Sequence, residues 1–347
     1  MADRFLIVRL GALGDIVHAI PVAAAIRRAF SSARIDWLVS AKHREVLDLV
    51  PVIDRRLVVN DRGDAGGGTS LAAAVRELRR SRYDVAFDLQ GLIKSAVLAR
   101  LSGAPRVIGF SSNYARESLA RPFYTDAHDP GRGGIYDPRE TRHVVEINLG
   151  ILTKIGLTAN QPEFPIDPIE SAAARHAADQ TGGRYALLNP GAAWPNKRWP
   201  PERFGQLAAA LRDEHGLRSV VLWGPGEEAL AHQTVAASGE SAVASDRTTI
   251  ADIVALARGA AVMVSGDTGP THLAGAVGTP LVGLYGPTRP ARNGPMAAAD
   301  ETVSRDAICQ CHHLRRCKLD RMCLLDIEVA EVVAAVGRRL AAGRPRV

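Results

Sequence analysis

The sequence predicts an α/β protein made of two doubly wound parallel sheets, and three observations support this. Short apolar runs alternate with helical segments along most of the chain. The stretch 158–168, TANQPEFPIDP, holds three prolines and interrupts the alternation, which then starts again. The length of 347 residues also exceeds one ordinary core, so two domains are expected. We place them at residues 1–160 and 161–326, followed by a C-terminal helical segment at 327–347.

The elements of the first half follow from apolar runs and helical periodicity. Strands are predicted at 5–10, 35–40, 55–60, 83–91 and 106–110, and helices at 16–30, 71–81, 92–103 and 143–157. Residues 111–141 lack periodicity and are rich in Gly, Pro, Arg and Asp. This stretch predicts a long functional or mobile loop.

The second half repeats the pattern with strands that each end in a polar or glycine-bearing loop. These strands are predicted within 185–191, 219–226, 261–267 and 280–286, and the tail 327–343 predicts an amphipathic helix. Ligands of parallel sheets bind beyond the carboxyl ends of the strands. Two such domains facing each other would therefore place their loops on either side of one cleft.

Composition and charge narrow the function classes. No apolar stretch of 18 residues occurs, and Arg9 and Asp15 interrupt the N-terminus too early for a signal peptide. We therefore expect a cytosolic protein. Residues 1–165 carry 23 Lys and Arg against 18 Asp and Glu, which favours an acidic partner for the first half. No nucleic-acid motif accompanies this charge, so no nucleic-acid partner is expected.

The most informative segment is 262–286, VMVSGDTGPTHLAGAVGTPLVGLYG. A strand leads there into a helix N-terminus, where free backbone N–H groups and the helix dipole attract an anion or a polyol. Asp267, Thr268 and His272 lie in the same turn. A purely structural turn needs Gly269 and Pro270 but not a carboxylate, a hydroxyl and an imidazole together, so a binding site is predicted.

A glycine-rich turn follows the first predicted strand. Gly11 and Gly14 permit a tight turn and the close approach of a ligand, but the spacing is not that of a dinucleotide-binding loop. A nicotinamide-dependent oxidoreductase is therefore disfavoured. Asp15 falls at the start of the next helix, and its pattern fits either an N-cap or a catalytic base.

Two strand ends in the second half carry charged groups. Lys197 lies in a loop with Pro, Gly and two tryptophans, and is either a diphosphate ligand or a surface lysine. Glu227 and Glu228 follow another strand. Their carboxylates are suited to accept hydrogen bonds from ribose hydroxyls, but either of them is equally suited to the first turn of a helix, which is the expected place of at least one. In the first half, Gln90 and Lys94 open a helix and either face the cleft or remain solvated.

Four cysteines cluster late in the chain with two histidines, His312 and His313, among them. Their spacing differs from the usual C-x2-C knuckles, so reduced thiols are favoured over a Zn or Fe site. The four cysteines of this cluster are Cys309, Cys311, Cys317 and Cys323.

The segments VRLGALGDIVHAIP, FDLQGLIKSA, NPGAAWPNKRWP and SGDTGPTHLAGAVGTPLVGLYGPT, in this order, resemble glycosyltransferase family 9. This family contains the ADP-heptose:lipopolysaccharide heptosyltransferases. The segments YDVAFDLQGLIKSAVLARL, NYARESLARPFY and RHVVEINLGIL look most like those of heptosyltransferase I. The resemblance covers nearly the whole chain.

This resemblance implies a GT-B fold, with two Rossmann-like domains on either side of a central cleft. It also implies inverting, metal-independent transfer of a heptose from ADP-L-glycero-β-D-manno-heptose to a Kdo residue of an acidic lipid A core, without a cofactor. The enzyme would then work at the cytoplasmic face of the bacterial inner membrane, with transient contact to its surface. A different donor or acceptor remains an alternative, as do a sugar-nucleotide epimerase of the same architecture and a non-catalytic sugar-nucleotide-binding protein.

The resemblance also assigns roles to residues. Asp15 matches the candidate general base, Lys197 the pyrophosphate-binding lysine and Glu227 a nucleoside-contacting residue. The donor-binding turn corresponds to Asp267, Thr268, Gly269 and His272. A pair of hydroxyl residues before the lysine is replaced by Ala192 and Ala193, so contacts to the donor phosphates at Ala193 would come from the backbone or be absent.

Acceptor binding is expected in the first domain. The candidates are Gly14, Gln90, Lys94 and, from location and charge, Arg62, Arg116, Arg121 and Arg142. Residues 327–347 would cross back to the first domain, as the last helix of such folds commonly does.

Overall fold

The computed structural model describes residues 3–60, 68–131, 133–312, 314–317, 319 and 321–343. The chain divides into two compact units, Met1–Asp167 and Pro168–Val347. Each unit holds one six-stranded sheet, and all the strand pairings of the described residues are parallel. The predicted α/β class with two doubly wound sheets is confirmed. The units divide seven residues after the boundary expected at 160/161.

The two sheets have the same strand order when the strands are counted along each unit. The first sheet runs β3-β2-β1-β4-β5-β6, with β1 (Arg4–Val8), β2 (Arg34–Ser40), β3 (Arg55–Val59), β4 (Val85–Asp88), β5 (Arg106–Phe110) and β6 (Asp126–His128). The second runs β12-β11-β10-β7-β8-β9, with β7 (Tyr185–Asn189), β8 (Arg218–Val221), β9 (Ala242–Ala244), β10 (Val262–Gly266), β11 (Leu281–Tyr285) and β12 (Glu301–Ser304). This is the doubly wound order, which reverses direction at one point in each sheet.

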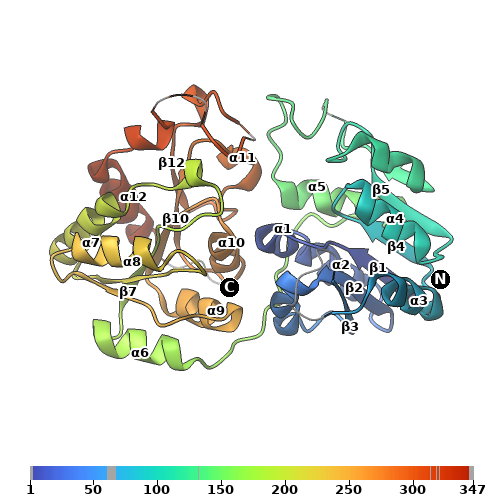
Figure 1. The fold of residues 1–347 in the computed structure, drawn as a ribbon, viewed down its shortest axis with the longest axis horizontal. Coiled ribbons are helices and arrows are strands. Elements are labelled where there is room, and N and C mark those ends of the chain that lie inside the picture. Colours follow the sequence, from blue (N-terminus) through green and yellow to red (C-terminus); the bar gives the residue numbers. More distant parts are fainter. Residues whose placement is uncertain are drawn as a thin grey trace. The chain divides into compact units, whose positions relative to one another are not determined.

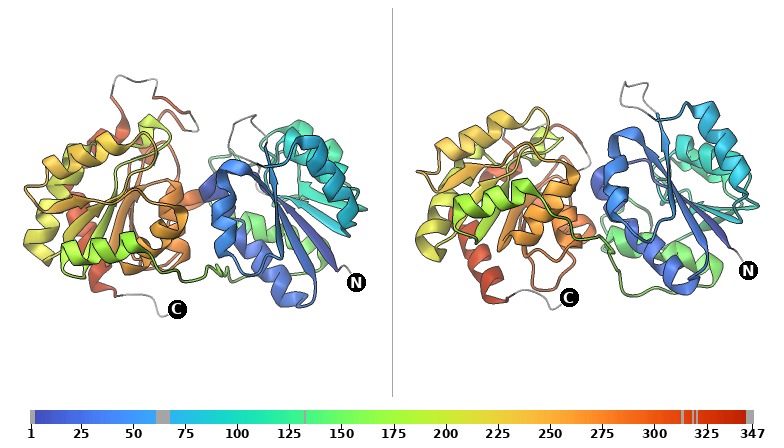
Figure 2. Two further views of the ribbon diagram at one scale, coloured as in Figure 1. Left: turned by 60° about the horizontal axis from the view of Figure 1, so that its bottom comes forward. Right: turned by 90° about the horizontal axis from the view of Figure 1, so that it is seen from below.

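Within each unit, helices lie on both faces of the sheet, as Figures 1 and 2 show. The first unit contains α1 (Leu13–Val17), α2 (Ile20–Ala29), α3 (Leu71–Ser81), α4 (Ile93–Leu101) and α5 (Val144–Gly150), with 3-10 turns η1 (Ala41–Leu49), η2 (Ser118–Phe123) and η3 (Ile151–Ile155). The second contains α6 (Ala172–Thr181), α7 (Pro201–His215), α8 (Glu228–Ala236), α9 (Ile250–Gly259), α10 (Gly269–Ala276), α11 (Pro290–Asn293) and α12 (Val329–Ala341), with η4 (Pro195–Lys197), η5 (Asp306–Ile308) and η6 (Cys323–Asp326).

The central strands are apolar along their whole length because helices cover both of their faces. In β1, the side chains of Leu6 and Val8 are fully buried and pack in one cluster with residues of α3, α4 and η2. In the second unit, Val262 and Val264 of β10 belong to a cluster that includes residues of α7 and α12. Each unit therefore has a hydrophobic core of its own. No helix of the described residues has the length and hydrophobicity needed to cross a membrane.

The C-terminal helix α12 departs from the sequence expectation. Its apolar stripe, which includes Val332 and Val336, is fully buried within the second unit's own core. The helix contacts α7, β11 and β12. Residues of 327–347 were expected to cross back to the first domain, but this helix instead completes the second unit, because its apolar face is occupied there.

The stretch 111–141, expected to be a loop without regular structure, contains η2 and β6. Strand β6 has only three residues and pairs with β5 at the edge of the sheet. The short edge strands β9 and β12 were also missed by the sequence analysis. These edge strands are short and only partly buried, so they lack the continuous apolar run by which the four-residue central strands β4 and β8 were recognised.

Candidate active site

Loops gather at the carboxyl edge of each sheet, and the strand order reverses there at one point. In the first unit this switch point lies between β1 and β4, and in the second between β7 and β10. Successive loops diverge to opposite faces at such a point and leave room for a ligand. Most of the predicted site residues follow one of these four strands. The candidate site is therefore described as two half-sites, one in each unit.

Asp15 is the centre of the first half-site. It is the third residue of α1, and its Oδ2 accepts a hydrogen bond from the Ala12 amide at 3.2 Å. The N-cap position belongs to Ala12, so the interpretation of Asp15 as the N-cap was wrong. Arg9 Nη2 lies 2.9 Å from Asp15 Oδ1, and Arg116 Nη2 lies 2.9 Å from Asp15 Oδ2. One guanidinium thus holds each carboxylate oxygen.

These two cations determine the charge of the carboxylate. Burial alone would raise the pKa of Asp15, but the positive charges of Arg9 and Arg116 outweigh burial and hold this pKa well below its usual range. Burial lowers the pKa of Arg9 to about 10, which leaves its guanidinium charged at neutral pH. The side chain of Arg9 is 5% exposed and that of Arg116 is 35% exposed. Asp15 is therefore ionised at neutral pH, between one buried cation and one accessible cation.

Gln90 supports the glycine-rich turn. Its Oε1 accepts a hydrogen bond from the Leu10 amide at 2.7 Å, so part of the side chain that was expected to face the acceptor is used to hold this turn. The backbone N–H of Gln90 donates to Asp88 Oδ1 at 2.9 Å. Asp88 is fully buried and its Oδ2 accepts hydrogen bonds from Ser95 and Tyr124. Burial raises the pKa of Asp88 despite these donors. Asp88 therefore ties together the loops after β4 and β5.

The other predicted acceptor residues differ in their exposure and in the groups that they contact. Gly14 is half-buried within α1, and Lys94 is exposed at the start of α4. Arg121 donates to the Tyr124 carbonyl at 3.1 Å. Arg142 Nη2 lies 2.5 Å from the buried carboxylate of Glu140. Arg62 lies outside the described residues.

Of the predicted arginines that the structure describes, Arg116 is the one that forms a hydrogen-bonded ion pair with Asp15. Arg121 and Arg142 are engaged in the local structure of the segment after β5 and β6. Sequence reasoning missed Arg9 as a partner of Asp15. The signal was present, since Arg9 ends the first apolar run six residues before Asp15.

Asp267 is the centre of the second half-site. Its Oδ2 lies 2.5 Å from Lys197 Nζ, and its Oδ1 lies 2.9 Å from His272 Nε2. Burial would raise the pKa of Asp267, but the hydrogen bond from His272 and the charge of Lys197 hold it far below its usual range. Lys197 Nζ also lies 4.5 Å from the centre of the Trp194 ring, a cation–π contact. The structure thus brings together Lys197, Asp267 and His272. The sequence analysis had predicted Lys197 as a site residue in one loop, and Asp267 and His272 in another segment of the chain.

Thr268 and Gly269 form the start of α10. Thr268 is the N-cap residue and Gly269 the first helical residue, with Pro270 after it. The Thr268 hydroxyl accepts a hydrogen bond from Asn189 Nδ2 at 3.0 Å. The same amide donates to Ser265 Oγ at 2.9 Å, so Asn189 fixes the turn between β10 and α10 from the end of β7. Sequence reasoning did not select Asn189, although it directly precedes the glycine loop after β7.

Glu227 lies beside the glycine loop that follows β7. Its Oε2 accepts a hydrogen bond from the Gly224 amide at 3.2 Å, and its Oε1 lies 3.9 Å from Arg198 Nη2. A Cβ atom on Gly191 would lie 2.1 Å from Glu227 Oε2, so a glycine is required for this approach. Ala193 is exposed in the same loop. Its methyl side chain offers no hydrogen bond, so any polar contact there comes from the backbone.

The four cysteines lie next to the Lys197 loop. They are free thiols, and Cys311 Sγ lies 3.5 Å from both Cys309 Sγ and Cys317 Sγ. Burial raises the pKa of Cys311 to about 12, which favours the protonated thiol. Asn196, the residue before Lys197, donates weakly to Cys311 Sγ at 3.8 Å.

Cys323 also belongs to this group, since it interacts with Cys309. Within the part of the chain that the structure describes, no group of three or more His, Cys, Asp or Glu side chains is arranged to hold a metal ion. His313, between the cysteines, lies outside the described residues. The cluster packs against the Lys197 loop through Asn196, whose side-chain amide also donates to the Leu314 carbonyl at 2.9 Å.

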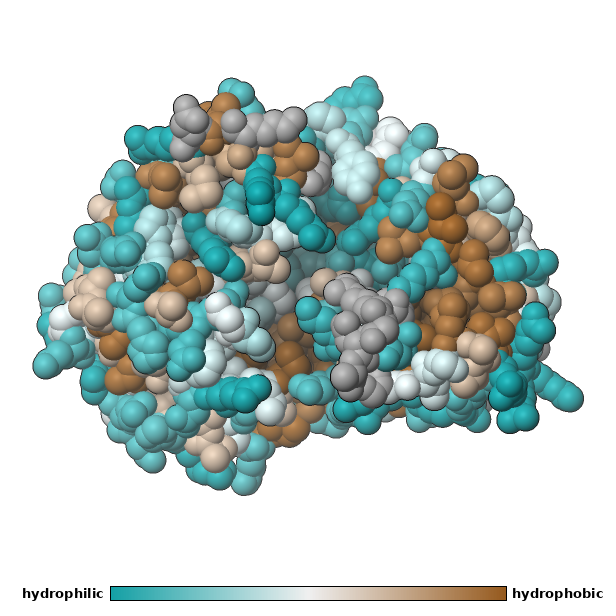
Figure 3. All heavy atoms as spheres, viewed as in Figure 1, coloured by the Kyte–Doolittle hydropathy of each residue, from teal (hydrophilic) through white to brown (hydrophobic). Residues whose placement is uncertain are grey.

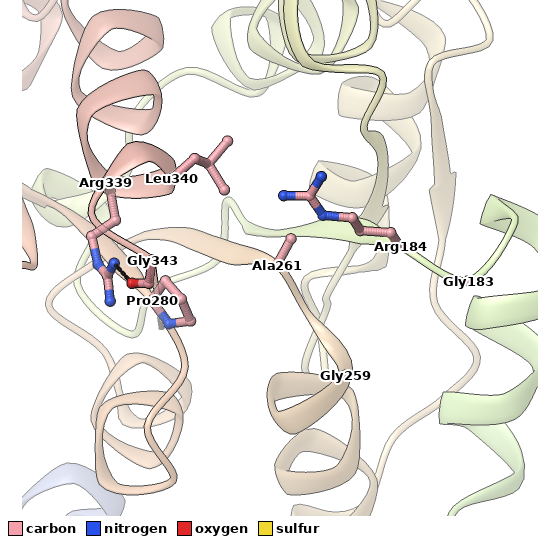
Figure 4. A pocket seen from close by; sticks show the side chains of 8 residues that line it. All are labelled: Gly183, Arg184, Gly259, Ala261, Pro280, Arg339, Leu340 and Gly343. Atoms are coloured by element: carbon pink, nitrogen blue, oxygen red, sulfur yellow. Dashed lines mark hydrogen bonds between the residues drawn. The ribbon is translucent and has the colours of Figure 1, made fainter. Parts of the chain in front are cut away.

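A cavity of about 310 Å³ lies at the opposite, amino-terminal edge of the second sheet, as Figure 4 shows. Residues just before three strands line it together with α12, among them Arg184, Ala261, Pro280, Arg339 and Leu340. The fully buried Arg339 donates to Asp300 Oδ1 and to the Gly343 carbonyl, each at 2.6 Å. These bonds hold α12 on the sheet. None of the predicted site residues line this cavity.

Comparison with known proteins agrees with this geometry. Residues 71–322 match the family model of glycosyltransferase family 9 (heptosyltransferase). Lipopolysaccharide heptosyltransferase 1 of Pseudomonas aeruginosa is 30% identical over 313 residues, which cover 88% of this chain and 85% of that protein. The protein of the same name from Salmonella typhimurium is 28% identical over 294 residues, covering 83% and 89%.

Two solved structures show the same fold. A family 9 glycosyltransferase from Veillonella parvula has a TM-score of 0.80 and 24% identity, with 98% of each chain covered. Heptosyltransferase WaaC of E. coli, solved with ADP, has a TM-score of 0.72 and 23% identity, covering 98% of this chain and 99% of that one. The GT-B fold that the sequence resemblance implied is confirmed by this likeness.

Proposed function

Because the chain belongs to glycosyltransferase family 9, the heptosyltransferases, we propose that it transfers a heptose from ADP-L-glycero-β-D-manno-heptose to a Kdo residue of the lipopolysaccharide inner core. The relatives that share 28–30% identity are lipopolysaccharide heptosyltransferases, which supports this donor and acceptor. The observation that carries the proposed chemistry is the ionised carboxylate of Asp15 at the switch point of the first sheet. The enzyme would act at the cytoplasmic face of the inner membrane, where its lipid-linked acceptor lies.

Donor binding is assigned to the second half-site. The ammonium of Lys197 and the free N–H groups at the start of α10 supply positive charge where a diphosphate would bind. Asp267 holds this ammonium in place and leaves two of its three N–H donors for phosphate oxygens. Glu227, held by Gly224, is suited to accept hydrogen bonds from ribose hydroxyls.

Asp15 is proposed as the general base. It takes the proton from the acceptor hydroxyl while the oxygen of that hydroxyl forms a bond to the anomeric carbon of the heptose. The bond from this carbon to the β-phosphate oxygen breaks on the opposite face, and ADP leaves with the electron pair, so the configuration inverts. Lys197 and the N-terminus of α10 stabilise the charge that develops on the leaving phosphate.

A carboxylate held by two guanidinium groups is a weak base, and this sets a requirement for the acceptor. Arg116 is the more accessible of the two cations. Kdo carries a carboxylate, and lipid A carries phosphates, so an incoming acceptor offers Arg116 another anion. We infer that Arg116 transfers to the acceptor anion, which frees Asp15 Oδ2 and raises its basicity only when the acceptor is bound.

Release of ADP tests this function directly. Purified protein would be mixed with ADP-L-glycero-β-D-manno-heptose, with and without Kdo2-lipid A, and ADP would be followed by a coupled assay. Release that requires both substrates supports the proposal. Donor binding by calorimetry without ADP release would redirect the search to other acceptors. If the protein neither binds the donor nor releases ADP, the donor assignment is overturned.

A further inference from the structure

Lys197 lies in a loop that is closed by its own hydrogen bonds. Arg198 Nε donates to the Ala192 carbonyl at 2.8 Å, and the backbone N–H of Lys197 donates to the Trp194 carbonyl at 3.0 Å. The methyl groups of Ala192 and Ala193 add no hydrogen bond. These bonds shape the loop, but they do not attach it to the rest of the second unit.

The segment that follows β12 lies beside this loop and contains the four cysteines. Its described residues, which we call the thiol segment, are 306–312, 314–317, 319 and 321–327. Ile308, Leu314 and Leu319 of this segment are exposed, and Figure 3 shows hydrophobic side chains on this part of the surface. Cys311 and Leu324 are buried. A few buried side chains, rather than a continuous apolar face, therefore attach the segment to the second unit.

Two side chains, one on either side of Lys197, attach the loop to the thiol segment. Asn196 is 2% exposed, and its Nδ2 donates to the Leu314 carbonyl at 2.9 Å. Trp199 is 1% exposed, and its Nε1 donates to the Ile327 carbonyl at 3.0 Å. The backbone that carries the lysine is thus held at positions 196 and 199 by the same segment.

The 3-10 turn η4 makes Asn196 and Lys197 face different partners. Three residues complete one turn of such a helix, so neighbouring side chains point about 120° apart. Asn196 is held by the thiol segment, while Lys197 Nζ lies 2.5 Å from Asp267 Oδ2. A lysine side chain is long and flexible, so the place of its ammonium depends on where the backbone of η4 is held.

We propose that Asn196 is a positioning residue, which places the ammonium of Lys197 for the diphosphate of the donor. The thiol segment supports it through the Leu314 carbonyl. The proposal rests on the proposed function, because it takes Lys197 as a ligand of the leaving phosphate. A displacement of about 1 Å at such a group costs up to about a hundredfold in rate. The segment with the four cysteines thus contributes to the reaction without touching the substrates.

A purely structural role for Asn196 is the alternative, and a variant of similar size separates the two. Among the described residues, Asn196 Oδ1 has no hydrogen-bond partner. Asn196→Leu removes the Nδ2 bond together with this unsatisfied oxygen, so the variant is expected to fold and to melt close to the unchanged protein. If it does not fold, Asn196→Ser takes its place in the experiment.

The experiment is a double-mutant cycle of Asn196→Leu and Lys197→Ala in the full chain. ADP release gives kcat and the donor KM, and calorimetry gives the affinity for ADP alone. We expect Asn196→Leu to lower kcat by about tenfold to a hundredfold and to weaken ADP binding. In the Lys197→Ala background, the same substitution should change neither value by more than about twofold, because Asn196 acts through the lysine.

Thr279→Val serves as the reference substitution. Thr279 is 3% exposed, and its hydroxyl donates to the Ala257 carbonyl at 2.8 Å, so this variant also removes one buried hydrogen bond to a backbone carbonyl. Thr279 directly precedes β11, at the edge of the sheet opposite the donor loop. Its kcat, donor KM and ADP affinity should match those of the unchanged protein.

The positioning role is overturned if the losses of the two single variants multiply in the double variant. It is also overturned if Asn196→Leu folds and keeps the kcat and ADP affinity of the unchanged protein, or if the unchanged protein does not bind ADP. Failure of the proposed function gives a different result, namely ADP binding without ADP release in the presence of both substrates. The cycle is then evaluated from the ADP affinities, which need no turnover.

Discussion

Arg116 and Asp15 are separated by 101 positions in the sequence, and yet the guanidinium of one lies 2.9 Å from the carboxylate of the other. The loops after β5 and β1 meet at the carboxyl edge of the sheet and create this pair. With Arg9 on the second oxygen, the carboxylate is kept ionised and weakly basic. The first half-site is therefore in a resting arrangement that an anionic ligand is able to change.

Asp15→Asn should remove the proposed base while preserving the shape of the side chain. We expect kcat to fall by about a hundred to ten thousand fold, the range for loss of a general base. ADP binding, measured by calorimetry, should stay within a factor of about two, because the proposed donor residues lie in the other unit. A variant with unchanged turnover would show that Asp15 is not the base.

Arg116→Gln should change the pH dependence of the reaction. Removing the accessible cation moves the pKa of Asp15 upward, toward its ordinary value of about 3.9. The acid limb of kcat/KM against pH should then shift to higher pH, and the acceptor KM should rise. Arg121→Gln is the matched control, since Arg121 donates to the Tyr124 carbonyl and should leave the acid limb in place. Identical profiles for the two variants would contradict the assigned role.

Lys197→Ala should weaken stabilisation of the leaving phosphate. Loss of one such donor typically lowers turnover by about a hundred to a thousand fold. The donor KM should rise too, because the ammonium would contact the diphosphate already before the reaction. Initial rates at varied donor concentration give both values. An unchanged kcat would place Lys197 outside the reacting centre.

Asp267→Asn should reduce stability in a manner that depends on pH. The folded protein holds the pKa of Asp267 below its unfolded value, so the carboxylate stabilises the fold above about pH 3.9, and this contribution is lost as the pH falls through the folded pKa. Removing one partner of a buried ion pair costs on the order of 3 kcal/mol. Urea unfolding at pH 7 should show this loss, and the difference from the unchanged protein should shrink in acid.

Gly191→Ala should disturb the donor loop. Its new Cβ would lie 2.1 Å from Glu227 Oε2 and must displace this carboxylate, so the donor KM should rise. Gly337→Ala is a matched substitution in α12, where the nearest neighbour, the His215 ring, is 3.6 Å away. A glycine replaced in an open helical position gains up to about 1 kcal/mol. Thermal melting should therefore show a higher melting temperature for Gly337→Ala, and initial rates should show a higher donor KM for Gly191→Ala.

The parts of the fold that the sequence predicted well are those with long apolar runs between turn residues. The helix expected at 71–81 is α3, and the strand expected at 106–110 is β5. The turn from β10 into α10 was also recognisable, because Gly269 and Pro270 mark the start of a helix by local chemistry alone. These features depend on neighbours in the sequence.

The rest depends on contacts between distant segments. That Gln90 would hold the Leu10 amide, or that Arg116 would reach Asp15, follows only from the way the loops meet at the edge of the sheet. The position of α12 was missed for a related reason. An amphipathic helix shows which of its faces is apolar but not which core will bury that face.

The burial of α12 also bears on the order in which the chain acquires structure during translation. The first unit has all its residues once position 167 has been made, whereas the second core lacks the side chains of Val332 and Val336 until α12 is made, up to position 341. At typical rates of synthesis, these 174 further residues take roughly 10 to 35 s. The nascent protein would thus hold a finished Asp15 half-site while the second sheet is still being made. That sheet remains apolar and uncovered on one face until α12 follows β12, so it is the part most in need of a chaperone.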